Sequence, residues 1–345
     1  MYNVTILDLP AGASSATPSG INDSGQVVGT SHFPSPPLEP IVIGTGQAVV
    51  WNGTTPTVLT LPPGAIGTSG LSINNAGQVA GIAWMEGVAI QATTWNGTTP
   101  TVLNSPAGPS FATGISNAGQ VVGDVTNNGT GQAVVWNGTT PTPLGPSGSS
   151  GVAINKSGQI AGSIAGAPVI WNGTISTALA APTGATTVNV AAINNAAQVV
   201  GSARYGEYGE TEVAVIWNGT TPTVLGSLGG SSSRATAIND AGLVVGSSRP
   251  VDDSSRGTIW DGTTAIDINT LLTSDPFGMI IYALTGINSS GQIVGSAYSW
   301  EDESFYAVLL TPVAQTPLPA ALPLFASGLG ALWFAGRRRR MKSAS

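Results

Sequence analysis

The fold is decided by a phrase of nine residues that recurs along the chain, first as Ile21-Asn22-Asp23-Ser24-Gly25-Gln26-Val27-Val28-Gly29. Similar phrases start at six further isoleucines: Ile73, Ile115, Ile154, Ile193, Ile238 and Ile287. A second phrase, Trp-Asn-Gly-Thr, follows each of the first six copies, at Trp51, Trp95, Trp136, Trp171, Trp217 and Trp260, the last with Asp in place of Asn. Such self-similarity is typical of repeat architectures in which every unit is one supersecondary structure.

Each repeat contains four segments that favour short strands. A run of small and apolar residues such as Ala235–Ile238 precedes an Asn-x-x-Gly turn, and a run such as Gln120–Gly123 follows it. The third segment ends in the Trp, and its Asn-Gly pair is a strong hairpin signal. The fourth segment, for example Pro100–Leu103, begins with Pro, where no donor to the sheet is lost.

Seven repeats of four strands, starting 39 to 52 residues apart, predict an all-β, seven-bladed β-propeller. The seventh repeat ends at Leu309-Leu310 without a fourth strand, and Val4–Leu9 matches the fourth strand at Pro56–Leu61. We therefore expect the N-terminal strand to complete the last blade and close the ring, so that the ring has no exposed sheet edge. A β-solenoid or a β-prism is the alternative architecture.

Closure by an outer strand also sets the orientation of every blade. The first, Ala- and Gly-rich strands should lie nearest the axis, and the repeated Trp residues should pack between neighbouring blades. The repeated Gln, as at Gln26, Gln78 and Gln120, is expected to bond backbone groups between blades.

The charge of the chain argues against nucleic acid as a partner. Formal net charge is −7, but Arg337, Arg338, Arg339, Arg340 and Lys342 are half of the ten basic residues. The rest of the chain carries five basic and seventeen acidic residues, so it would repel phosphate backbones. The absence of cysteine excludes disulfides, thiolate metal sites and cysteine nucleophiles.

The C-terminal segment predicts membrane targeting. Three regions are expected: the repeats at 1–312, a linker at 313–316, and a tail at 317–345. The tail contains Pro317, Leu318, Pro319 and Ala320, then an apolar run to Gly336 that is expected to form a transmembrane helix, then the four arginines. The arginines should stay on the cytoplasmic side of the inner membrane and leave the repeats outside.

This tail resembles the PEP-CTERM sorting signals of Gram-negative bacteria in their Val-Pro-Leu-Pro-Ala form, with Thr316 in place of the Val. The resemblance implies processing by exosortase, a membrane-embedded transpeptidase, and a role beside exopolysaccharide in biofilms. The repeats resemble the HAF-repeat family of extracellular proteins, which implies location rather than activity. Export also requires a signal peptide, which the expected strand at Val4–Leu9 does not provide, so we expect a leader upstream of this start. The alternative is a cytoplasmic protein, for which the C-terminal signal would have no use.

The sequence predicts no enzyme. His32 is the only histidine, and no Gly-x-Ser-x-Gly motif accompanies it. Acidic residues do cluster between the second and third strands of blades five to seven. They are Glu207, Glu210, Glu212, Asp252, Asp253, Glu301, Asp302 and Glu303. Solvated loop charge is the simplest interpretation, Ca²⁺ binding is an alternative, and paired carboxylates would also suit glycoside hydrolysis.

The leading functional prediction is a non-catalytic protein of the cell surface or matrix that binds exopolysaccharide or a surface protein through its variable loops. Aromatic residues in the same loops are the candidates for stacking on sugars: Tyr205, Tyr208, Tyr298 and Trp300. An extracellular carbohydrate-active hydrolase or lyase and a passive structural protein are the two alternatives.

Overall fold

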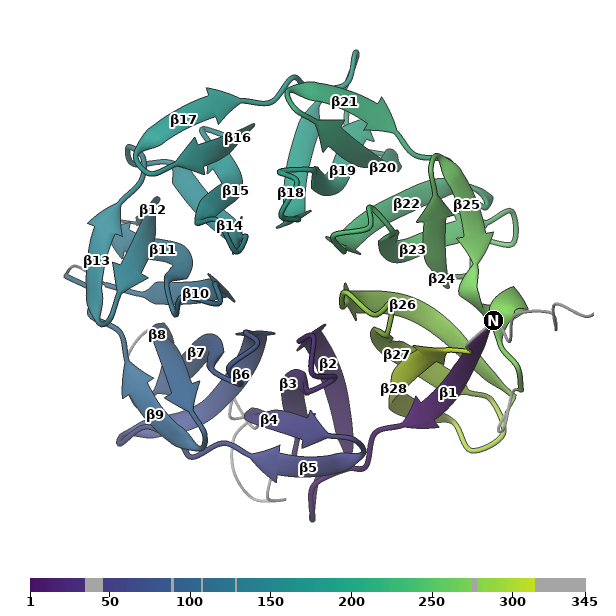
Figure 1. Cartoon of the computed structure of the whole chain (residues 1–345), viewed down its shortest axis with the longest axis horizontal. Coiled ribbons are helices and arrows are strands. Elements are labelled where there is room, and N and C mark those ends of the chain that lie inside the picture. Colours follow the sequence, from purple (N-terminus) through teal and green to yellow (C-terminus); the bar gives the residue numbers. More distant parts are fainter. Residues whose placement is uncertain (35–45, 88–89, 107, 128, 275–277, 314–345) are drawn as a thin grey trace, which may run out of the picture. The chain divides into compact units, whose positions relative to one another are not determined.

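Each repeat folds into an antiparallel sheet whose strands follow one another in chain order. The computed structural model describes residues 1–34, 46–87, 90–106, 108–127, 129–274 and 278–313. Within the unit formed by residues 1–312, the sheets are arranged in a ring around a central axis (Figure 1). We call the sheets blades 1 to 7 in chain order.

The strands of blades 1 to 4 have these bounds. Blade 1 consists of β2 (Ser15–Ile21), β3 (Val27–His32), β4 (Gly46–Asn52) and β5 (Thr55–Val58). Blade 2 consists of β6 (Ala65–Ile73), β7 (Val79–Met85), β8 (Ile90–Asn96) and β9 (Thr99–Val102). Blade 3 consists of β10 (Ser110–Ile115), β11 (Val121–Asn127), β12 (Thr130–Asn137) and β13 (Thr140–Pro143). Blade 4 consists of β14 (Ser149–Ile154), β15 (Gln159–Ile164), β16 (Ala167–Asn172) and β17 (Ile175–Ala178).

The remaining strands form blades 5 to 7. Blade 5 consists of β18 (Thr187–Ile193), β19 (Val199–Tyr205), β20 (Thr211–Asn218) and β21 (Thr221–Val224). Blade 6 consists of β22 (Gly229–Ile238), β23 (Val244–Pro250), β24 (Arg256–Asp261) and β25 (Thr264–Asp267), and a 3-10 helix, Ile268–Leu271, follows it. Blade 7 consists of β26 (Met279–Ile287), β27 (Ile293–Ser299), β28 (Ser304–Pro312) and β1 (Tyr2–Ile6). Blades 5 and 6 are joined by one parallel pair, Glu212 with Ser232.

The N-terminal strand closes the ring as the sequence predicts. β1 runs antiparallel to β28, with Tyr2 opposite Pro312 and Ile6 opposite Val308. Tyr2 and Leu7 are buried, and Leu310, at the position of the repeated Trp, is fully buried. The first strands lie innermost in Figure 1 and the fourth strands outermost, which confirms the predicted orientation.

The last Gly of the repeated phrase is required by close backbone packing. A register shift lies between Ala112 and Gly114 of β10, at the point where that strand passes Gly123 of β11. A Cβ added to Gly123 would lie 1.8 Å from the carbonyl oxygen of Phe111, far inside van der Waals contact. The bulge therefore admits only glycine, and equivalent clashes arise at Gly81, Gly201 and Gly246.

The six repeated Trp residues form the core between blades. Each is at most 1% exposed, so the predicted burial is confirmed. Trp51, for example, packs with Leu7 and with Val294 and Leu309 of blade 7. Its indole Nε1 donates a hydrogen bond to the carbonyl of Asp8, in the connection that enters blade 1 (2.8 Å).

The predicted tail falls outside the described residues. The Pro motif, the apolar run and the arginine cluster all lie in 314–345, and only Val313 of the predicted linker is described. In the described part of the chain, no helix is long and apolar enough to span a membrane.

Candidate functional site

The propeller presents two different faces. Because consecutive strands of a blade are antiparallel, the Asn-x-x-Gly and Asn-Gly turns lie at one end, and the longer loops and the blade connections lie at the other. We call these ends the turn face and the loop face. All three predicted acidic clusters belong to the loop face.

The Asn of each repeated phrase links its blade to the next. In blade 1, Asn22 Oδ1 accepts hydrogen bonds from the amides of Ser24 and Gln26, which hold the turn. Its Nδ2 donates to the carbonyl of Asn74 in blade 2 (3.0 Å). The same bond to the next blade is made by Asn74, Asn155, Asn194, Asn239 and Asn288. The sequence prediction gave this role to Gln and was wrong, because the Gln side chain instead accepts from the Asn of its own turn, as Gln26 does from Asn22 (2.8 Å).

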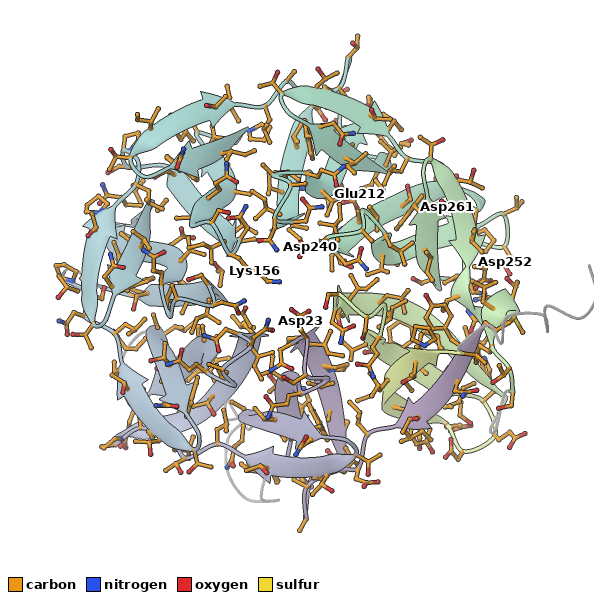
Figure 2. The ribbon with its side chains drawn as sticks, viewed as in Figure 1. Asp23, Lys156, Glu212, Asp240, Asp252 and Asp261 are labelled. Carbon is orange, nitrogen blue, oxygen red and sulfur yellow. The ribbon has the colours of Figure 1, made fainter. Side chains whose placement is uncertain are left out.

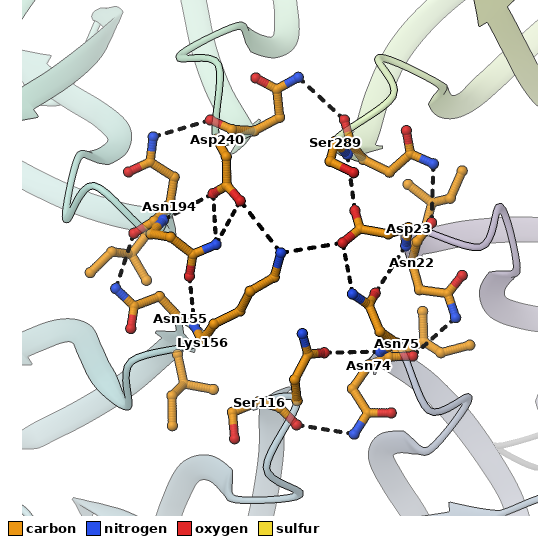
Figure 3. A pocket seen from close by; sticks show the side chains of 18 of the residues that line it. Asn22, Asp23, Asn74, Asn75, Ser116, Asn155, Lys156, Asn194, Asp240 and Ser289 are labelled. Atoms are coloured by element: carbon orange, nitrogen blue, oxygen red, sulfur yellow. Dashed lines mark hydrogen bonds and ion pairs between the residues drawn. The ribbon is translucent and has the colours of Figure 1, made fainter.

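The residues that follow these Asn side chains surround the mouth of the channel on the turn face, a polar pocket of about 160 Å³. Lys156 extends across this mouth from blade 4 (Figures 2 and 3). Its Nζ lies 3.3 Å from Asp23 of blade 1 and 3.4 Å from Asp240 of blade 6. One ammonium group therefore connects three blades that are remote in sequence.

The hydrogen bonds at the mouth favour the charged forms of these residues. Partial burial alone would raise the pKa of Asp23, but donors on Ser289, Asn75 and Lys156 outweigh it and lower that pKa well below its usual value. Asp240 is shifted in the same direction, since hydrogen bonds from Asn195 and the charge of Lys156 outweigh its partial burial. The pKa of Lys156 is raised, because the two carboxylates outweigh the effect of its partial burial.

Among the described residues, the seam between blades 3 and 4 lacks the hydrogen bond that an Asn side chain makes to the next blade at the other seams. In blade 3, Ser116 replaces the Asn, and its Oγ accepts from the amide of Gln120 in its own turn.

Trp171 of blade 4 is also exceptional, because its buried Nε1 has no hydrogen-bond partner among the described residues. The other five Trp residues donate to a backbone carbonyl in the connection that precedes their own blade. The equivalent carbonyl for Trp171 is that of Gly145, and it accepts a hydrogen bond from the side chain of Gln132 instead. The seam between blades 3 and 4 is held in part by Asp124, which accepts from Ser150 Oγ and the amide of Gly151.

The structure does not bring the eight predicted carboxylates into one site. Glu212 is held by Arg234 and Arg204 and accepts from Ser202, whereas Glu207 and Glu210 are exposed in the loop before it. Asp252 pairs with Arg256, and Asp253 pairs with Arg249. Asp302 accepts from the hydroxyl of Tyr306, and Glu301 and Glu303 are exposed. No three His, Cys, Asp or Glu residues gather to hold a metal ion in the described part of the chain.

Two of the four predicted aromatic residues meet in a cluster on blade 7. The rings of Tyr298 and Trp300 are 4.8 Å apart and nearly perpendicular. Phe305 lies 4.9 Å from Tyr298 and 6.1 Å from Tyr282. Trp300 is 70% exposed and Phe305 57% exposed, so a broad apolar surface faces the solvent. We call Tyr282, Tyr298, Trp300 and Phe305 the aromatic platform.

The other two predicted aromatic residues lie on blade 5. Tyr205 packs against the core there, and Tyr208 is exposed in the loop. Sequence reasoning missed Tyr282 and Phe305 because it considered only the loop segments that contain the acidic clusters. The pairing of β27 with β28, which places Phe305 directly opposite Tyr298, was a signal that could have found Phe305.

Comparison with solved structures identifies the fold of the ring of blades. The chain matches the β-propeller domain of the Trilobed protease from Pyrococcus furiosus with a TM-score of 0.58 at 13% identity, over 88% of this chain and 97% of that one. The body of this chain is a β-propeller.

Two further solved structures match with TM-scores above 0.5. The match to YCF48 bound to D1 peptide has a TM-score of 0.51 at 12% identity and covers 92% of this propeller chain and 97% of that chain. A prolyl endopeptidase matches with a TM-score of 0.53 at 9% identity, over 87% of this chain and 51% of that one. At such identities the likeness concerns the fold alone. No family model and no curated protein matches the chain, so the HAF-repeat and PEP-CTERM resemblances stay predictions.

Proposed function

We propose that this propeller is a non-catalytic surface or matrix protein that binds exopolysaccharide through the aromatic platform of blade 7. The observation that carries the proposal is that the exposed rings of Trp300 and Phe305 both pack against the half-buried ring of Tyr298. Aromatic rings have large flat apolar faces, which match the apolar faces of sugar rings. The rings contact one another, Tyr298 lies in β27, Phe305 lies in β28, and Trp300 directly follows β27. Little side-chain freedom is therefore lost when a ligand binds.

Carboxylates of the loop face support binding rather than catalysis. Glycoside hydrolysis needs two carboxyl groups that face one another across the scissile bond. Glu212, Asp252 and Asp253 are instead each paired with arginine. Cleavage of a glycan, by a hydrolase or a lyase reaction, is the competing hypothesis. An assay for new reducing ends tests it on the same samples.

Binding of exopolysaccharide should depend on the two exposed rings of the aromatic platform. Trp300→Ala together with Phe305→Ala should weaken binding of the full-length protein to the producing organism's exopolysaccharide by about tenfold, which is about 1.4 kcal/mol. Titration calorimetry with Ca²⁺ and with EDTA measures this loss and also tests the alternative interpretation that the acidic loops bind Ca²⁺. Tyr208→Ala is the matched control, because Tyr208 is an 86% exposed aromatic residue on another blade. Binding that survives the double substitution unchanged would refute the proposal, and no binding at all would favour the passive structural alternative.

We also propose that the protein reaches the cell surface through its C-terminal tail. The order of the Pro motif, apolar run and arginine cluster at 317–345 supports exosortase as a partner and the inner membrane as a transient location. Replacement of Arg337 to Arg340 by Gln should leave the unprocessed form in the membrane fraction. Immunoblots of cells with and without exosortase measure this accumulation, and processing that is equal in both strains contradicts it.

A further inference from the structure

The few basic residues of the propeller are concentrated in one region. Outside the tail the chain has five, and four of them are arginines of blades 5 and 6. Arg204 lies on β19, and Arg234, Arg249 and Arg256 lie on the three successive strands β22, β23 and β24. In a body with seventeen acidic residues, this gathering places most of the positive charge of the propeller on two neighbouring blades.

Two of these arginines line a pocket on the loop face with a volume of about 230 Å³. Its other lining residues are one carboxylate and four serines: Glu212, Ser232, Ser247, Ser248 and Ser255. Two guanidinium groups face one carboxylate, so the formal charge of the lining is positive. The remaining lining groups are hydroxyls, which donate hydrogen bonds to oxyanions.

Glu212 positions Arg234 rather than occupying all of its donors. The Nε and Nη2 of Arg234 both donate to Glu212 (3.0 Å each), so Nη1 remains for a ligand. Glu212 can hold Arg234 in a fixed position, because the side chain of Glu212 is only 12% exposed and also contacts Arg204. Hydrogen bonds from Arg234 and Ser202 outweigh its partial burial, so its pKa is lowered and it stays ionised.

Arg249 and two serines have unused donors as well. Arg249 uses Nη1 for Asp253 (3.1 Å), an exposed pair, and its Nε and Nη2 make no hydrogen bond to the described residues. The hydroxyls of Ser232 and Ser247 also make no hydrogen bond within the described residues. The hydroxyl of Ser248, by contrast, donates to the carbonyl of Ser232. Free guanidinium forks match the geometry of carboxylate and sulfate oxygens.

The pocket adjoins the aromatic platform. Ser255 lines the pocket, and its Oγ donates to the carbonyl of Tyr282 (2.8 Å). The ring of Tyr282 packs edge-on against Phe305. A polymer stacked on the platform can therefore place a substituent in the pocket of the neighbouring blade.

We infer that the Arg234–Arg249 pocket binds an oxyanion group of the ligand, so that the polysaccharide recognised is an acidic one. This inference rests on the proposed function and specifies its substrate class. The group is a carboxylate, as in uronic acids, or a sulfate ester. Both present oxygens that accept from Arg249, from Arg234 Nη1 and from Ser247.

The test uses three polymers with one backbone: dextran, carboxymethyl dextran and dextran sulfate. Full-length protein should bind at least one charged polymer about tenfold more tightly than dextran, and the preferred one identifies the anion. Arg249→Gln and Ser247→Ala should each abolish that preference and leave binding to dextran unchanged. Arg249 is chosen because its ion pair with Asp253 is exposed, and near-UV circular dichroism of the buried Trp residues checks the fold.

Lys156→Gln is the matched control, because it removes the same charge from the opposite face of the propeller. Equal losses for Lys156→Gln and Arg249→Gln would show non-specific attraction and overturn the inference, as would equal affinity for all three polymers. The two proposals fail separately. Loss of the charge preference with Arg249→Gln, combined with no effect of Trp300→Ala and Phe305→Ala, would support the pocket and refute the platform.

Discussion

At the scale of single residues, one lysine gives the channel mouth its organisation. Lys156 bridges Asp23 and Asp240, and each carboxylate also accepts from amides or hydroxyls of a neighbouring blade. Exposed ion pairs contribute little on their own. This ammonium serves two carboxylates at once, and without it they would repel each other across the mouth.

Lys156→Met should therefore lower the free energy of unfolding by about 0.5–1 kcal/mol at low salt, and by less at high salt. Urea unfolding at two salt concentrations measures the difference. Lys156→Arg is the control that keeps the charge. A loss that does not depend on salt would contradict an electrostatic origin.

The same site predicts a pH dependence. Asp23 and Asp240 have lowered pKa values in the folded protein, so the stability that they contribute is complete above their ordinary pKa of 3.8. It is lost as the pH falls through the lowered values, where both carboxylates become protonated. The stability difference between the native protein and Lys156→Met should therefore be constant from pH 5 to 7 and shrink below about pH 3.8, which acid titration of both proteins will show.

At the scale of elements, the seams between blades are not equivalent. Six seams have a hydrogen bond from an Asn side chain to the next blade, and the seam between β10 and β14 has Ser116 at that position. The same seam contains Trp171, whose Nε1 has no hydrogen-bond partner in the described part of the chain. In place of the Asn bond, this seam has the half-buried Asp124, which accepts from Gly151 and Ser150 of the next blade. Burial raises the pKa of Asp124 despite these two donors. This seam is the one at which the ring should open first.

Ser116→Asn should stabilise the propeller by about 0.5–1.5 kcal/mol, because the new amide can donate to the carbonyl of Asn155. Asn194→Ser makes the reverse change at an intact seam and should destabilise by a similar amount. Hydrogen exchange should show slower opening of β14 in the first variant. If Ser116→Asn has no effect while Asn194→Ser destabilises the protein, the missing Asn hydrogen bond does not limit the stability of the seam between blades 3 and 4.

At the scale of the whole molecule, the ring depends on residues from opposite ends of the repeat region. β1 supplies the outer strand of blade 7, and the amide of Leu7 extends the pairing to the carbonyl of Ala307 (2.9 Å). Without this strand, β28 would present unpaired backbone groups beside an uncovered apolar surface.

Deletion of residues 2–7 should therefore abolish the monomeric propeller and cause association at micromolar concentration. Light scattering after size-exclusion chromatography measures the association. Asn3→Ala with Thr5→Ala is the control, because it keeps the backbone pairing and should stay monomeric. A deletion variant that remains monomeric with an unchanged melting temperature would show that closure is dispensable.

Much of this architecture follows from local patterns in the sequence. The Asn-Gly and Asn-x-x-Gly turns determine the hairpins, since glycine adopts positive φ, as at Gly25 and Gly53, without strain. The alternation around each Trp determines which face of the third strand is buried. The match of Val4–Leu9 to Pro56–Leu61 determines the closure, because both are strands that need a partner on one side only.

What only the tertiary structure decided is the identity of the sites. The ion pairs of Lys156 span 133 and 84 residues of sequence, and no local pattern encodes such distances. The gathering of four arginines and the meeting of Tyr282 with Phe305 likewise arise because neighbouring strands and blades place side chains together. Turns and strands depend on interactions between residues close in sequence, whereas a binding surface depends on which blades become neighbours, and that is established only when the ring closes.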